Sequence, residues 1–221
     1  MLSGWNSAKL SAQSPPWSKN ALPSTTSASW SFKCLVSPAN TNGGEDFNLF
    51  NLAKLVKHSL ETENKIQSIC SSFVDAKGSM FLGRGYSFPI ALEGALKLKE
   101  LAYVHAEGYP AGEMKHGPLA LIEAGMPVVV IAPRDQHYKK TISNMQEVIA
   151  RGAKVLLITN KSKDEVYSEN IWETIEVENT NDDLFPFLVT IPLQKLAYYS
   201  ALKKGYDIDK PRNLAKSVTV E

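Results

Sequence analysis

The chain has few cysteines, almost no net charge and no long apolar run. Its 221 residues include two cysteines, Cys34 and Cys70, which excludes a disulfide framework and a cysteine-rich metal site. The 24 basic and 23 acidic residues leave a net charge of +1, which argues against a nucleic-acid binder that relies on a large positive field. No apolar run reaches the roughly 18 residues that a membrane-spanning helix needs. Sparse cysteine and the lack of a signal-peptide pattern favour a reducing, cytoplasmic setting.

Acidic residues are missing altogether from residues 1–44. This segment also lacks arginine, and it holds ten serines, four prolines and only three lysines. No helical or strand period runs through it, and a segment that buries so little cannot offset its chain entropy. We therefore expect residues 1–44 to be a disordered or atypical N-terminal tail. A targeting peptide and a segment foreign to the original gene remain alternatives, although transit peptides are usually rich in arginine.

Residues 45–221 are predicted to form one α/β domain. Short buried apolar runs alternate with helical segments, a spacing typical of a parallel sheet covered on both faces. The expected fold is doubly wound, with a mostly parallel sheet of about five strands between two layers of helices. The expected strands are 80–82, 103–107, 128–132, 155–158 and 172–177. The expected helices are 46–76 (one or two), one from Ser87 with that serine as its N-cap, 111–123, 137–150 and 184–204, the last capped by Gly205. Residues 207–221 are predicted to be an extended tail.

Two glycines flank Arg84 at the end of the first predicted strand. The backbone N–H groups of residues 83–85 and the start of the next helix could hold an anion, since ligands bind beyond the carboxyl ends of parallel strands. A tight turn without a ligand is the other interpretation, because two glycines at a strand-to-helix turn are common.

A narrow charged stripe runs along the helix that follows. With 100° per residue, Lys97 lies at about 40° and Glu100 at about −20° from Glu93, and leucines flank the stripe on both sides. A solvated helix normally shows a broad polar face. The narrow stripe is therefore predicted to face a cleft, where charged side chains that lie close together are typical of a functional site. A partly exposed ladder of salt bridges is an equally good alternative.

His116 and Lys216 are weaker candidates when each is taken alone. His116 lies between Lys115 and a Gly-Pro pair near a helix end, a position where we expect the imidazole to be exposed. Lys216 lies in a mostly apolar C-terminal tail, and it becomes a candidate for imine formation only if the tail folds over a cleft. The other three histidines have no convergent carboxylate or cysteine, so no metal site is expected.

Four blocks together resemble the glutamine–fructose-6-phosphate aminotransferase family: residues 83–85, 92–100, 112–121 and 211–221. The similarity covers roughly residues 79–221 and corresponds to the second sugar isomerase (SIS) domain of that enzyme. It implies conversion of fructose 6-phosphate to glucosamine 6-phosphate without a cofactor or a metal. Lys216 would form the imine with the sugar, beside Ala215 in the substrate site, and Glu100 would move a proton between C1 and C2. Ring opening and proton transfer would be assisted by Glu93, Lys97 and His116. His116 would reach into the site of a neighbouring subunit.

The chain also departs from that family. We expect it to lack two domains of that family: the glutaminase domain, whose cysteine follows the initiator Met, and the first SIS domain, which holds the sugar phosphate. Three hypotheses remain open: an isomerase module of the enzyme, a sugar-phosphate-binding or dimerising module without turnover, and a truncated gene product. SIS domains generally associate in pairs, so we expect a homodimer or a partner chain that carries the missing SIS domain.

Overall fold

The computed structural model describes residues 49–161 and 170–214. These residues belong to one of the two units into which the chain divides, residues 42–221. The expected boundary after residue 44 lies outside the described residues, as do the expected site residues Ala215 and Lys216. No helix in the described part of the chain combines the length and the apolar character needed to span a membrane.

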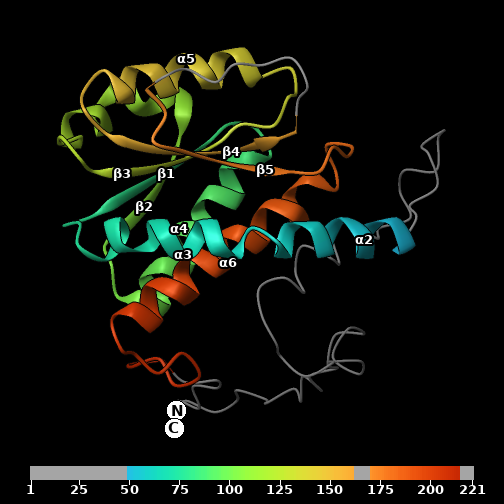
Figure 1. The fold of residues 1–221 in the computed structure, drawn as a ribbon. Helices are drawn as coiled ribbons and strands as arrows, with labels where there is room; N and C mark the ends of the chain where they lie inside the picture. The colour runs from blue at the N-terminus through green and yellow to red at the C-terminus, as the bar shows by residue number, and fades with distance from the viewer. Residues whose placement is uncertain (1–48, 162–169, 215–221) are drawn as a thin grey trace, which may run out of the picture. The chain divides into compact units, whose positions relative to one another are not determined.

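Five parallel strands form the central sheet, as the sequence predicts (Figure 1). The strands are β1 (Ser79–Gly83), β2 (Ala106–Pro110), β3 (Pro127–Ile131), β4 (Lys154–Asn160) and β5 (Glu173–Val177). Their spatial order is β2-β1-β3-β4-β5, so successive strands are added first to one side of β1 and then to the other. Every residue of β1 and β3 is buried, because helices cover both faces at the centre of the sheet.

Helices cover both faces of the sheet (Figure 1). One face carries α3 (Glu63–Val74), α4 (Ser87–Ala102) and α6 (Phe185–Lys203), and the other carries α5 (Tyr138–Ile149). Alternating strand side chains divide the core accordingly, with Phe81 in the cluster under α3, α4 and α6, and Leu82 in the cluster under α5. The helix α2 (Leu49–Leu60) packs against α6. This is the doubly wound, three-layer architecture predicted from the sequence.

The segment after β2 differs from its prediction. Residues 111–123, expected to be one helix, form two 3-10 helices, η2 (Ala111–His116) and η3 (Pro118–Leu121). Gly117 between them has a φ of 140°, and Pro118 has no backbone N–H to donate. An α-helix therefore cannot run through this point.

Both ends of α4 also differ from their predictions. Ser87 is the first helical residue rather than the N-cap; Tyr86 occupies the cap position, and no side chain caps the helix. At the other end, Tyr103 has a left-handed backbone with φ 51° and ψ 36°. This conformation ends the helix, so the strand expected at 103–107 begins only at Ala106.

The structure confirms the prediction that Gly205 caps α6. Gly205 has a φ of 72°, and its N–H donates to the carbonyl of Leu202 at 2.9 Å. The N–H of Tyr206 donates to the carbonyl of Ala201 at 3.1 Å. These two bonds define a Schellman motif, which stops the helix and fixes the direction in which residue 206 leaves it.

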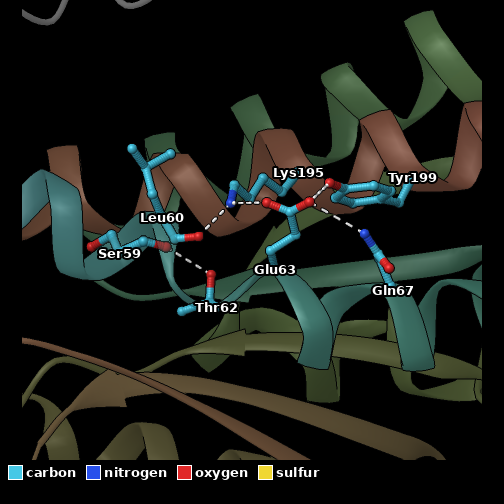
Figure 2. A network of polar contacts seen from close by, with 7 residues as sticks. All are labelled: Ser59, Leu60, Thr62, Glu63, Gln67, Lys195 and Tyr199. Carbon is cyan, nitrogen blue, oxygen red and sulfur yellow. Dashed lines mark hydrogen bonds and ion pairs between the residues drawn. The ribbon is translucent and has the colours of Figure 1, made fainter.

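A polar network joins the corner between α2 and α3 to α6 (Figure 2). The Glu63 carboxylate accepts hydrogen bonds from the Tyr199 hydroxyl and, at 3.3 Å, from Gln67. The Lys195 ammonium lies 3.2 Å from Glu63 and donates to the carbonyl of Leu60. The Glu63 carboxylate therefore connects α3 to α6, and Lys195 of α6 extends the connection to Leu60, the last residue of α2.

This network predicts acid sensitivity of the fold. The Tyr199 hydrogen bond, followed by that of Lys195, lowers the pKa of Glu63 from 4.5. A carboxyl with a lowered folded pKa stabilises the fold above its unfolded pKa, and this contribution is lost as the pH falls through the folded value. We expect Glu63→Gln to remove part of the loss of stability below pH ~4.5. Chemical unfolding between pH 7 and pH 3 measures it, with Glu113→Gln as control; identical pH profiles for Glu63→Gln and the unmodified chain would contradict the prediction.

Candidate active site

The charged stripe of α4 forms an ion-pair ladder. The Lys97 ammonium lies 2.6 Å from a carboxylate oxygen of Glu100 and 3.7 Å from one of Glu93. The three side chains are only 20–29% exposed. The salt-bridge alternative of the sequence analysis is thus present in the structure. Unlike a solvated surface ladder, however, this one is mostly withdrawn from water.

One hollow among the described residues does not have the ladder in its wall. That hollow, about 430 Å³ in volume, lies at the amino ends of β1 and β3, where Ser79 and Met126 line it. A second, much smaller hollow lies between Tyr86 and Pro133. Neither has the ladder in its wall. The flank of α4 that carries the ladder instead presents two half-exposed leucines, Leu92 at 44% and Leu96 at 40% exposure.

The two glycines around Arg84 have structural explanations. A Cβ at Gly83 would lie 2.2 Å from the carbonyl oxygen of Ser87, so only glycine lets the first turn of α4 pack this closely. Gly85 has a φ of 56°, a left-handed conformation that favours glycine. These observations support the tight-turn interpretation. The Arg84 guanidinium itself lies against Gly112, where a Cβ would come within 2.2 Å of it.

His116 is exposed at the last position of η2. Met114 in the same helix is 1% exposed and packs into the core cluster under α5, and Lys115 pairs with Glu147 of α5 at 3.0 Å. These contacts hold the segment while the imidazole faces outward. In the described ranges no hydrogen bond or ion pair joins His116 to Glu100, so this chain's own fold does not bring the two predicted residues into contact.

The described part of the C-terminal tail is attached to the end of α4. The ring of Tyr103 packs on that of Tyr206, with centroids 4.7 Å apart, and the Arg212 guanidinium lies 4.1 Å above the Tyr103 ring. The backbone N–H of Arg212 donates to the Tyr103 hydroxyl at 2.7 Å. Aromatic and cation–π contacts contribute about 0.5–1.5 kcal/mol each, enough to offset the roughly 1–2 kcal/mol that left-handed backbone costs a residue such as tyrosine.

No local sequence pattern predicts this attachment. The glycine signal at Gly205 predicts where α6 ends, but no local pattern pairs Tyr206 with Tyr103.

Among residues 49–161 and 170–214, no group of three or more histidine, cysteine, aspartate or glutamate side chains could hold a metal ion.

This domain is similar to a known domain family and to known proteins. The profile of the SIS domain matches residues 72–204. The chain is 51% identical over 173 residues to the glutamine–fructose-6-phosphate aminotransferase (isomerizing) of Bartonella henselae, which is 78% of this chain but 28% of that protein. It is 47% identical to the solved C-terminal domain of glucosamine-fructose-6-phosphate aminotransferase from Francisella tularensis, with a TM-score of 0.70, covering 73% of this chain and 45% of that one. Glucosamine-6-phosphate deaminase from Thermotoga maritima is 27% identical, with a TM-score of 0.60, and the match covers 78% of this chain and 50% of that one.

Proposed function

This chain belongs to the SIS-domain family, and on that premise we propose that it is an isomerase module of glucosamine 6-phosphate synthesis. The substrate would be fructose 6-phosphate, and the reaction a ketose–aldose shift with amination to glucosamine 6-phosphate. About half of the matched residues are identical to those of an aminotransferase (isomerizing), which supports this assignment. The chain spans only 28% of the length of that relative, so the activity of the isolated chain is part of the proposal.

The ladder supplies the group that a ketose–aldose shift requires. Such a reaction needs one base that removes a proton from one carbon and returns it to the next. We assign this role to Glu100, because its side chain is only 29% exposed and its carboxylate lies 2.6 Å from the Lys97 ammonium. That ammonium also lies 3.7 Å from Glu93, so Lys97 and Glu93 can pass protons during ring opening.

Lys216 would form the covalent bond to the sugar in the proposed mechanism. Its amine would condense with the sugar carbonyl and release water, and the cationic imine would acidify the neighbouring C–H for Glu100. Attachment of the tail to Tyr103 is the observation that carries this assignment. Arg212 lies at the same end of α4 as Glu100, and the four residues from Arg212 to Lys216 can span at most about 14 Å. Ala215 would line the same substrate site.

A second protein surface would complete the site. The exposed His116 has no contact with the ladder in the described part of this chain, which supports a role in the site of a neighbouring subunit. The half-exposed Leu92 and Leu96 beside the ladder would also be covered in such an assembly. The partner would be a second copy of this chain or a chain that carries the first SIS domain of the family. The cytoplasm is the proposed setting.

One observation favours a second candidate function. The ladder does not line either described hollow, which is what a sugar-phosphate-binding or dimerising module without turnover, or a truncated gene product, would show.

A coupled assay of the purified full chain tests the proposal. We expect conversion of fructose 6-phosphate to glucose 6-phosphate without ammonium, and formation of glucosamine 6-phosphate when ammonium is added. The absence of turnover from a folded chain would contradict an independent isomerase. Recovery of turnover on addition of a chain with the first SIS domain of the family would then support a split enzyme.

A further inference from the structure

Tyr103 has a backbone conformation that bulky side chains rarely adopt. Its φ of 51° and ψ of 36° lie in the left-handed region, where asparagine and glycine are common and a tyrosine is unusual. A residue in such a strained conformation needs compensating contacts, and strained residues cluster at functional sites. The contacts present are those of the ring with Tyr206 and Arg212.

The contacts of Tyr103 form a continuous stack between two helix ends. Tyr206 is held by the Schellman motif at the end of α6, and the Lys204 ammonium lies 5.4 Å from the centre of its ring. The Tyr103 ring packs on Tyr206, and the Arg212 guanidinium packs on Tyr103. The ends of α4 and α6 are therefore joined through two rings, and the tail is attached to them.

Arg212 is bound to Tyr103 in two independent ways. Its side chain lies over the aromatic ring at 4.1 Å, and its backbone N–H donates to the hydroxyl at 2.7 Å. A side-chain contact alone would leave the backbone free to turn, whereas the backbone bond fixes both position and direction. Tyr103 thus determines where the chain runs immediately before its last residues.

We propose that Tyr103 is a positioning residue for Lys216. Tyr103 follows Glu100 by three residues, so the base and the attachment point of the tail are on the same last turn of α4. Lys216 is four residues after Arg212, so the point at which Arg212 is held limits the position of Lys216 to within about 14 Å. The inference rests on the proposed function, because that function gives Lys216 and Glu100 their roles.

Two substitutions separate the position of the tail from the stability of the fold. Tyr103→Asn removes the ring and the hydroxyl but suits a left-handed backbone, so the domain should unfold at or near its original midpoint. Tyr103→Phe keeps the ring and removes only the acceptor for the Arg212 N–H. Tyr86→Asn is the matched control, because Tyr86 is 80% exposed at the opposite end of α4.

Limited trypsin digestion followed by mass spectrometry measures the attachment without any activity. Cleavage after Arg212 should become severalfold faster in Tyr103→Asn, by less in Tyr103→Phe, and should not change in Tyr86→Asn. Cleavage after Arg151, which follows the end of α5, serves as the internal reference. An unchanged rate after Arg212 in Tyr103→Asn, or the same increase in Tyr86→Asn, would overturn the proposal.

Turnover measurements test the positioning role itself. In a chain that isomerises fructose 6-phosphate, Tyr103→Asn should lower kcat by up to about 100-fold, the loss expected for a misplaced reacting group, with an unchanged unfolding midpoint. Faster cleavage together with unchanged kcat would contradict positioning. If the unmodified chain shows no turnover, the proposed function of the isolated chain fails, whereas the digestion still decides whether Tyr103 holds Arg212.

Discussion

Replacing Lys216 by alanine is expected to abolish sugar-dependent labelling of the chain by borohydride. In the proposed mechanism the lysine amine condenses with the carbonyl of fructose 6-phosphate, and borohydride reduces the resulting imine to a stable secondary amine. Alanine has no amine, so no adduct can form at this position. Intact-mass measurement of the chain, with and without the sugar, shows the adduct directly.

Lys210→Ala is the control for this experiment. Lys210 is an exposed lysine of the same tail, and its loss should leave labelling unchanged. Labelling of Lys216→Ala at the original level would refute the assignment of Lys216. An unmodified chain without any sugar-dependent adduct would show that imine chemistry does not take place in the isolated chain.

Glu100→Gln is expected to lower isomerisation by about 10²- to 10⁴-fold, the usual contribution of a general base. The substitution keeps the shape of the side chain and removes its ability to accept a proton. Lys97 retains Glu93 as an ion-pair partner at 3.7 Å, so the helix should keep its structure. Because imine formation precedes proton transfer, Glu100→Gln should still be labelled by borohydride.

Combining the two readouts makes this prediction specific. A variant that is labelled but does not isomerise has lost only the proton transfer. Glu123→Gln, an exposed carboxylate that pairs with Lys77 beside the large hollow, should keep full turnover. Turnover of Glu100→Gln within a factor of a few of the original would mean that another group acts as the base.

Local pattern was sufficient where one element decides the outcome. The helical period alone places Glu93, Lys97 and Glu100 on one stripe, and the structure shows them as a ladder. Gly205 likewise ends α6 because a left-handed turn is required at that single position. In contrast, the expected helix 111–123 failed because apolar spacing outweighed Gly117 and Pro118 in the prediction, whereas backbone geometry prevails in the structure.

Contacts between distant segments could not be predicted in the same way. The left-handed backbone of Tyr103 has no signature in its neighbours, since tyrosine does not favour this region. Its stability comes from Tyr206 and Arg212, residues about half the chain away, which meet it only after α4 and α6 have packed. The position of the ladder outside both described hollows depends on tertiary packing for the same reason.

By itself, the sequence determined the parallel α/β fold, the charged stripe and the candidate residues, because hydrophobic period and short motifs are local properties. Only the tertiary structure decided that the ladder is mostly withdrawn from water, that His116 lies apart from it, and that the described part of the tail is attached at Tyr103. These features depend on which surfaces meet, and the meeting of surfaces is set by the packing of whole helices against the sheet.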